Sequence, residues 1–287
     1  MRRRDFLALS GAAAGLAGLA GCAGPAGTRT LPTPLRDESG FPAEATYGFG
    51  EEAGAELTAV AALNVTVRRS DHYSTGSGAL DVYAPPDSYL VSVRVTARGE
   101  QRPPLSAFEL QVGEESYPAL TSVAGRPLSS LLTRYDPYAP DADPDPDGRL
   151  LLFEVPAGST GETAAVVWTP PGGEPAYWPI PDRERAALGR SLPPLTVEAF
   201  ETPGTAGVDA DPTATLQVAN GGDRDGTLRA ALNYAGAVDA SETLSVSVPA
   251  GETTATEYGL PWNGRRLEVE LAWAGPHEQR TIEPEGE

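Results

Sequence analysis

The chain has 287 residues, 40% of them hydrophobic, so it is long enough for two domains and apolar enough to build their cores. Its 21 basic residues are all Arg and its 40 acidic residues give a formal net charge of −19, which argues against nucleic acid or an anionic membrane face as a partner. The absence of Lys excludes phosphate-binding P-loops and Schiff-base chemistry, and a single Cys, Cys22, excludes disulfides and Cys-based zinc sites.

The first 22 residues have the organisation of an export signal. A basic start is followed by an uncharged run from Ala8 to Ala20, which is shorter than the about 20 residues that a membrane-spanning helix needs. The start resembles a twin-arginine translocation signal, carried by Arg3, Arg4, Phe6 and Leu7. The end, Leu-Ala-Gly-Cys, resembles a lipobox, which implies that Cys22 is lipidated and anchors the mature chain at the extracellular face of the cell membrane.

The composition also suggests a habitat and a tether. An acidic chain with Arg in place of Lys resembles the exported proteins of salt-loving archaea, because near-molar salt shortens the Debye length to about 3 Å and screens self-repulsion. Residues 23–48 are rich in Gly, Pro, Ala and Thr without an apolar period, and we expect a flexible tether.

From residue 49 onward, short alternating runs of β-branched and aromatic residues are bounded by Gly, Pro and Asp, which predicts strands. The first domain, 49–181, is expected to contain strands at 63–67, 89–95, 108–112, 151–155, 164–168 and 176–180. A short helix and linker at 182–194 ends at Pro193-Pro194 and marks the domain boundary.

The second domain, 195–287, has seven predicted strands, at 195–200, 213–220, 227–234, 243–248, 253–258, 267–273 and 279–282. This count and spacing is typical of an immunoglobulin-like sandwich. We therefore predict an all-β fold with two tandem Ig-like antiparallel β-sandwiches after a signal peptide and a flexible tether.

The two halves also resemble each other and known families. The run 153–158 matches 246–251, each a strand entering a Pro-Ala-Gly turn, and 93–99 parallels 216–222, which predicts an insertion at about 117–148 in the first domain. The strands around 89–93 and 148–156 are similar to telokin-like secreted lipoprotein domains. The segments 218–222 and 248–253 resemble cell-adhesion-related Ig-like domains of archaeal and bacterial surface proteins. The resemblance implies fold and location and transfers no catalytic residue.

The insertion contains a literal match to a calcium loop. Counted from Asp143, acidic residues occupy positions 1, 3 and 5, Gly148 position 6 and Glu154 position 12, so the ligands would be Asp143, Asp145, Asp147 and Glu154. Pro144 and Pro146 stiffen the loop and a strand follows it in place of a helix, so a solvated acidic loop is the favoured interpretation and calcium the alternative.

Catalytic constellations are scarce. A blue-copper site lacks its thiolate and axial Met, because Cys22 is used by the lipid and Met1 is removed. No Gly-x-Ser-x-Gly motif is present, and His72 and His277 lie in turn-rich segments where we expect exposed loop residues rather than a general base.

Aromatic and polar surface residues offer two further candidates. Trp178 and Trp262, beside Pro, are candidates for exposed sugar-stacking residues, although core packing is the default; Trp168 and Trp273 are expected in the core. Asn64 carries the sole glycosylation sequon and is predicted to face outward.

The sequence therefore favours a non-catalytic, lipid-anchored cell-surface protein of a halophilic archaeon that binds, adheres or acts as a spacer. It requires no cofactor unless the loop binds calcium. Its partners are the membrane, through the lipid, and a cell-surface protein or glycan, with nucleic acid excluded. Two alternatives stay open: a calcium-stabilised adhesion or ligand-binding module, and a small secreted hydrolase.

Overall fold

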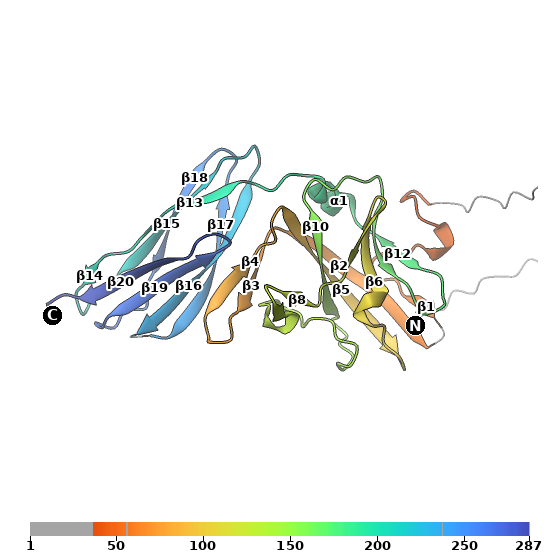
Figure 1. Cartoon of the computed structure of the whole chain (residues 1–287), viewed down its shortest axis with the longest axis horizontal. Coiled ribbons are helices and arrows are strands. Elements are labelled where there is room, and N and C mark those ends of the chain that lie inside the picture. Colours follow the sequence, from red (N-terminus) through yellow and green to blue (C-terminus); the bar gives the residue numbers. More distant parts are fainter. Residues whose placement is uncertain (1–36, 56, 237, 287) are drawn as a thin grey trace, which may run out of the picture. The chain divides into compact units, whose positions relative to one another are not determined.

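The computed structural model describes residues 37–55, 57–236 and 238–286. The signal residues Arg3, Arg4, Phe6 and Leu7 and the lipidation residue Cys22 lie outside this part of the chain. The described residues form an all-β fold with two antiparallel sandwiches, one before and one after the short helix α1 (Asp182–Leu188) in the chain (Figure 1). None of the helices in this described part is long and apolar enough to cross a membrane.

The first sandwich consists of two four-stranded sheets. One sheet has the order β1-β2-β5-β10, and its strands are β1 (Ala53–Ala55), β2 (Thr58–Arg68), β5 (Ser88–Gly99) and β10 (Arg149–Pro156). The other has the order β12-β11-β6-β7, with β6 (Phe108–Val112), β7 (Glu115–Pro118), β11 (Ala164–Trp168) and β12 (Ala176–Pro179).

Alternating side chains fill the space between these sheets. Val91, Val93 and Val95 of β5 point into the core with Phe153 of β10, and Trp168 of β11 is 1% exposed. Because successive strand residues face opposite sides, Ser92 and Arg94 of β5 point to the outer face of the sheet. This outer face carries the site described below.

The second sandwich pairs a three-stranded with a five-stranded sheet. The first, β13-β15-β18, has strands β13 (Leu195–Glu201), β15 (Thr213–Asn220) and β18 (Thr253–Gly259). The second, β14-β20-β19-β16-β17, has β14 (Thr205–Ala206), β16 (Gly226–Gly236), β17 (Ala240–Val248), β19 (Leu267–Trp273) and β20 (Glu278–Pro284). The sequence predicted every one of these strands except the two-residue β14.

The strand β10 takes the place in its sheet that β18 takes in the second sandwich, since β5 pairs with β2 and β10 just as β15 pairs with β13 and β18. The matching Pro-Ala-Gly turns, however, follow β10 and β17. The sequence match between 153–158 and 246–251 therefore reflects similar turns after strands that are not equivalent. The match between 93–99 and 216–222, in contrast, lies in the equivalent strands β5 and β15. The insertion lies between β7 and β10, where the second sandwich has the short turn after β17.

An unpredicted hairpin leaves the first sandwich between β2 and β5. Its strands, β3 (Asp71–Ser74) and β4 (Leu80–Tyr83), contact the outer face of β16 and β19. The Asn233 side chain pairs with Leu80 as a strand backbone would: Leu80 N donates to Asn233 Oδ1 and Asn233 Nδ2 donates to Leu80 O, both at 2.9 Å. The hairpin thus ties the two sandwiches together.

The predicted tether ends earlier than expected. Phe41 is 5% exposed and stacks on Tyr177 of β12 with ring centroids 4.8 Å apart. Thr46 forms a parallel bridge with Tyr177, and Tyr47 N donates to Tyr177 O at 2.8 Å. Residues 41–47 therefore belong to the first sandwich, because aromatic side chains among the small residues bury apolar surface there. Within the predicted helix and linker at 182–194, the helix α1 ends at Leu188.

Candidate functional site

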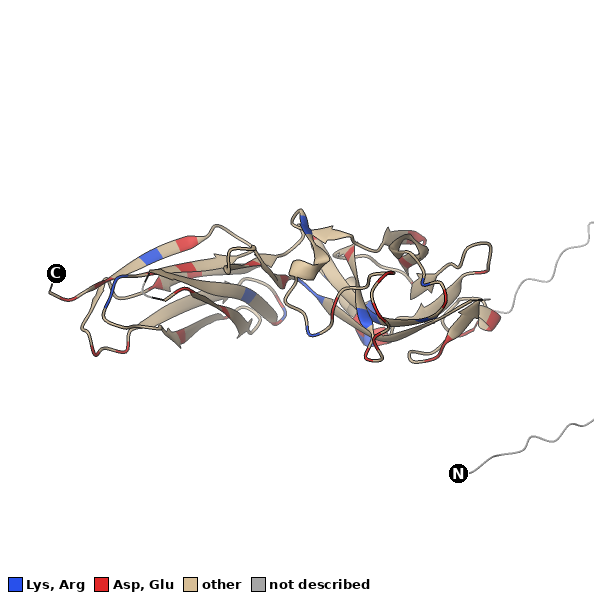
Figure 2. Cartoon of the chain, turned by 90° about the horizontal axis from the view of Figure 1, so that it is seen from below, with Lys and Arg blue, Asp and Glu red and all other residues tan. Residues whose placement is uncertain are grey.

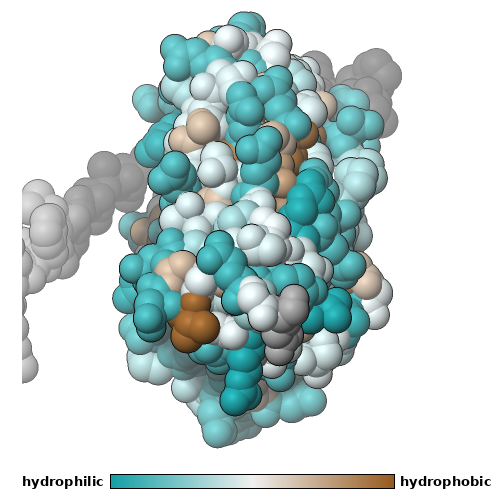
Figure 3. All heavy atoms as spheres, turned by 90° about the vertical axis from the view of Figure 1, so that its left-hand side faces the viewer, coloured by the Kyte–Doolittle hydropathy of each residue, from teal (hydrophilic) through white to brown (hydrophobic). Residues whose placement is uncertain are grey.

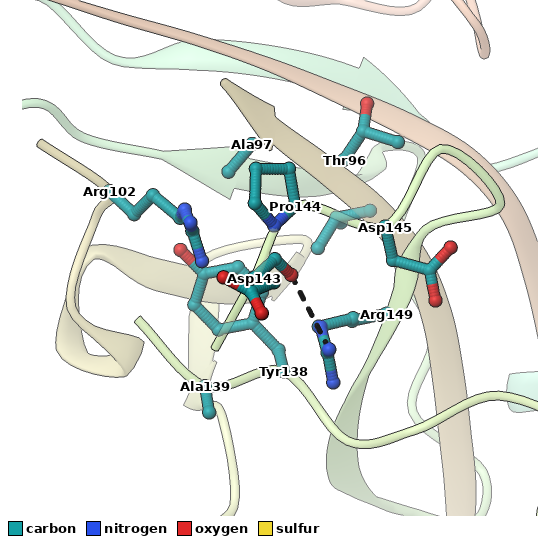
Figure 4. Close-up of a pocket in the computed structure, with 10 residues that line it drawn as sticks. Thr96, Ala97, Arg102, Tyr138, Ala139, Asp143, Pro144, Asp145 and Arg149 are labelled. Carbon is teal, nitrogen blue, oxygen red and sulfur yellow. Dashed lines mark hydrogen bonds between the residues drawn. The ribbon is translucent and has the colours of Figure 1, made fainter. Parts of the chain in front are cut away.

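The predicted calcium loop folds around Arg side chains. Pro144 and Asp145 pack beside Ala97 and Tyr138, and Arg149 Nη2 donates to Asp143 O at 3.4 Å (Figure 4). The cavity at this point is about 10 Å³, no more than one water needs. Arg102 and Arg149 both line it, so a cation would meet two guanidinium groups there.

Glu154 is not brought to this loop. It lies five residues beyond Arg149 along β10, about 17 Å in an extended strand, and it faces opposite to Phe153 and Val155. The Tyr83 hydroxyl donates to Glu154 Oε1. Burial raises the pKa of Tyr83, with Glu154 adding to the effect. Among the described residues, no group of three or more Asp, Glu, His or Cys side chains is placed to hold a metal ion, and Asp143, Asp145, Asp147 and Glu154 do not gather.

The two histidines differ from each other. The prediction of an exposed His72 is wrong: it lies on β3, is 5% exposed, and its Nε2 lies 2.8 Å from Ala230 O of β16. His72 is buried because the hairpin contacts the second sandwich. The turn-forming residues that flank His72 gave no sign of this contact. His277 is half exposed, with Nε2 3.2 Å from Asp81 Oδ1 and Nδ1 3.2 Å from Glu270 Oε1. Neither arrangement includes a serine nucleophile.

The tryptophans do not form a sugar platform. Trp178 is fully buried and its Nε1 donates to Glu51 O, and Trp262 Nε1 donates to Gly207 O at 2.7 Å. Trp178 is therefore a core residue, and Trp262 is partly buried against the second core, as expected when an indole N–H finds a backbone acceptor. Trp168 is in the core as predicted, and Trp273 packs at the edge of the second core.

Asn64 is exposed, as predicted, and lies at the rim of a cavity. The register of β2 shifts between Ala62 and Asn64, so Leu63 forms a bulge and Asn64 pairs with Arg94 of β5. The bulge places Asn64, Thr66 and Arg68 on the same outer face as Ser92 and Arg94.

This outer face forms the floor of a cavity in which Arg side chains outnumber carboxylates. Thr66 pairs with Ser92, and Arg68 Nη2 donates to Ser92 Oγ at 2.7 Å. Arg94 Nη1 donates to the Tyr135 hydroxyl at 2.8 Å, and its guanidinium carbon lies 4.7 Å from the Tyr135 ring centroid. Two adjacent strands thus present two Arg side chains to one space.

The walls come from three other segments. The insertion supplies Leu132, Thr133, Arg134 and Tyr135, and Leu132 N donates to His72 O, which fixes this segment to the hairpin. The hairpin supplies Asp71, and β16 of the second sandwich supplies Arg229. We call this cavity of about 210 Å³ the arginine pocket; its charged residues are Arg68, Asp71, Arg94, Arg134 and Arg229.

The arginine pocket contains four guanidinium groups and one carboxylate, although the chain as a whole is strongly acidic. Arg68 Nη1 lies 3.1 Å from Asp71 Oδ2, which neutralises one cation. Burial lowers the pKa of Arg68; Asp71 raises it and Arg229 lowers it further. Acidic residues are spread over both sandwiches, whereas Arg residues are fewer (Figure 2). Arg68, Arg94 and Arg229 are partly buried and Arg134 is exposed. This surplus of positive charge favours an oxyanion, which guanidinium groups bind through paired N–H donors.

A larger groove on the second sandwich lacks this surplus. It has a volume of about 700 Å³ and lies beside β16, β19 and β20. Its cations are already paired: Arg266 Nη2 lies 2.9 Å from Glu268 Oε1, and Arg280 Nη2 2.6 Å from Glu278 Oε2. The arginine pocket is therefore the stronger candidate.

Sequence reasoning missed every Arg of the pocket. The one available signal was local: Thr66 and Arg68 alternate with buried Val65, and Ser92 and Arg94 with Val91 and Val93. Strand pairing brings these two rows together, and no pattern in the sequence shows that Arg134 and Arg229 join them.

Comparison with known proteins gives no family. No family model matches the chain, and no curated protein matches it. Solved structures that it resembles include a β-glucosidase from Listeria innocua, with TM-score 0.28, 11% identity and coverage of 33% of this chain and 17% of that one. Another is a novel β-glucosidase from Erythrobacter marinus, with TM-score 0.27, 15% identity and coverage of 33% of this chain and 16% of that one. The chain thus spans about a sixth of the length of these enzymes, and TM-scores this low carry no argument about activity.

Proposed function

We propose that the protein is a non-catalytic, lipid-anchored protein of the extracellular cell surface that binds an oxyanion-bearing ligand in its arginine pocket. The single observation that carries the binding function is the convergence of Arg68, Arg94, Arg134 and Arg229 on one cavity of a strongly acidic chain. Carboxylates, sulfates and phosphates are the groups that such a cluster binds.

A binding function without chemistry is also favoured by the side chains around the pocket. Asp71 is ion-paired with Arg68, and His72 is hydrogen-bonded to Ala230 O. Nucleophilic catalysis needs a base beside a nucleophile, and the pocket offers guanidinium groups in that place. The hydrolase alternative is therefore the weaker one.

Hydrophobic docking of a protein partner has less support. In the described part of the chain the exposed large hydrophobic side chains are Leu57, Leu132 and Val208, which belong to different segments. The face seen in Figure 3, which lies at the left-hand side of Figure 1, is mostly hydrophilic. A polar ligand with an anionic group suits such a surface better than an apolar one.

The test is thermal unfolding with sulfate or chloride at equal ionic strength. Sulfate should raise the melting temperature of the wild type, since a ligand that binds only the native state stabilises it. Arg94→Gln should remove this gain, whereas Arg98→Gln should keep it, because Arg98 lies exposed on the same strand and outside the pocket. An equal gain in both variants would contradict the proposed site.

The anchor rests on the sequence of residues 1–22 and has its own test. Cys22→Ser should release the protein from the membrane fraction into the medium, because one acyl-bearing residue would be lost. Retention of the variant on the membrane would contradict lipid anchoring and leave the binding proposal intact.

A further inference from the structure

A second cavity adjoins the arginine pocket and adds three carboxylates to two of its Arg side chains. It has a volume of about 350 Å³ and shares Arg94, Arg134 and Tyr135 with the arginine pocket. Its remaining lining is acidic, and we call these residues the acidic rim: Asp136, Asp145 and Asp147. The two cavities together form a site with a positive and a negative end.

Arg94 and Arg134 line the second cavity together with the acidic rim and do not pair with it. The guanidinium carbons of Arg94 and Arg134 lie 4.7 and 5.4 Å from the Tyr135 ring centroid. Among the described residues neither of these Arg side chains forms an ion pair, while Asp136 pairs with Arg149 at 3.5 Å. Both Arg side chains lie against the Tyr135 ring and line the same cavity as Asp145 and Asp147, without forming an ion pair with either.

The loop geometry fixes the acidic side. Asp145 Oδ1 accepts from Asp147 N at 2.9 Å, and Asp145 O accepts from Gly148 N at 3.0 Å. Gly148 has φ +83 and its Cα lies so close to Val95 O that a Cβ would approach to 3.0 Å, so the turn sits directly on β5. The carboxylates are therefore held beside Arg94 by backbone structure rather than by attraction to it.

We infer that this site takes a zwitterionic ligand, with its anionic group in the arginine pocket and its cationic group at the acidic rim. The inference rests on the proposed function and narrows its ligand class. Opposite charges held apart across a cavity are each left under-neutralised, and a ligand bearing both charges satisfies them together. The same carboxylates repel a simple anion, so they select for the zwitterion.

The experiment compares matched probes at constant ionic strength by calorimetric titration. A series of ω-amino carboxylates with two to six carbons is titrated against the unsubstituted carboxylates of equal length. At one chain length the amino carboxylate should bind about three- to fivefold more tightly, as expected for one added, partly exposed charge pair.

Asp147→Asn should abolish this preference while carboxylate binding stays equal or becomes tighter, because one repelling charge is removed. Asp147 is chosen over Asp145, which holds the turn. Asp141→Asn is the matched control, since Asp141 is exposed in the same loop and lines neither cavity; it should keep the preference.

The two probe series could bind equally at every length, with no effect of Asp147→Asn. This result would overturn the inference of a zwitterionic ligand and leave the oxyanion proposal standing. If neither series binds, and sulfate does not bind, both proposals fail. A preference that Asp141→Asn removes as well would assign it to overall charge and would also overturn the inference.

Discussion

At the scale of single residues, Gly148 determines where Arg94 lies. A Cβ at Gly148 would come within 2.9 Å of Arg94 Cγ and 3.0 Å of Val95 O, and its φ of +83 is a conformation that only glycine adopts without strain. The floor of the arginine pocket therefore depends on a glycine that carries no charge itself.

Gly148→Ala should lower the free energy of unfolding by about 2 kcal/mol and weaken sulfate binding, because the new methyl group displaces Arg94. Gly158→Ala is the matched control: it has φ +82, and nothing lies within 4 Å of its added Cβ. Chemical denaturation and the sulfate shift of both variants test this. Equal losses in both would show that backbone strain alone matters.

His72 makes stability depend on pH. Burial lowers its pKa below the ordinary value near 6.5, the hydrogen bond to Ala230 and Asp71 oppose this shift, and Arg229 adds to it. The unfolded chain then binds a proton at a higher pH than the folded chain does. The contribution of neutral His72 to the free energy of unfolding is complete above about pH 6.5. It is lost as the pH falls from there toward the lowered pKa of His72 in the folded chain.

His72→Gln should remove this acid-sensitive part of stability, by up to about 1.4 kcal/mol per pH unit within that window. The side-chain amide of Gln can still donate toward Ala230 O. The measurement is the free energy of unfolding from pH 7.5 to 5 for both proteins, since other titrations cancel in the difference. Parallel curves would contradict the assignment to His72.

At the scale of elements, the hairpin β3–β4 couples the two sandwiches through Asn233. Besides its two bonds to Leu80, Asn233 Oδ1 accepts from Ser241 Oγ at 2.8 Å and Nδ2 donates to Glu270 Oε2 at 3.1 Å. Removal of such a fully bonded side chain is destabilising, because its partly buried partners lose their hydrogen bonds.

Asn233→Ala should destabilise the protein by about 1–3 kcal/mol and split one thermal transition into two, as the sandwiches unfold separately. Ser245→Ala is the control, an exposed position on the neighbouring strand β17. Differential scanning calorimetry measures both. A single unsplit transition in Asn233→Ala would show that the coupling between the sandwiches does not depend on Asn233.

The elements themselves were largely predictable and their long-range contacts were not. The strands at 108–112, 164–168, 213–220 and 267–273 match the observed bounds, because alternation and turn residues are local signals. The hairpin was missed because its burial depends on Asn233 and Ala230, which follow more than 150 residues later in the chain. The arginine pocket was missed for the same reason: its four cations come from four separate segments.

At the scale of the whole molecule, net charge governs the response to salt. A formal charge of −19 produces self-repulsion in the folded state that salt screens, so the melting temperature should rise between about 0.1 and 2 M KCl. Circular dichroism at both salt concentrations measures this rise, and a constant melting temperature would contradict it.

Calcium should stabilise the protein by screening its net negative charge rather than by binding at the predicted calcium loop. Ca²⁺ and Mg²⁺ at matched ionic strength should raise the melting temperature equally, and Asp145→Ala should not cancel the effect of calcium, since Arg102 and Arg149 line the cavity at the acidic loop. A gain specific to Ca²⁺ that disappears in Asp145→Ala would restore the predicted calcium site.

The packing of residues 41–47 on β12 has a consequence for self-association. β12 pairs with β11 along one side, and Thr46 and Tyr47 meet Tyr177 on the other. An uncovered outer strand offers free backbone groups to a second chain. A chain shortened to begin at residue 49, as the sequence alone would suggest, would strip this cover and the Phe41 ring from β12, and should form dimers or larger assemblies that the longer chain resists.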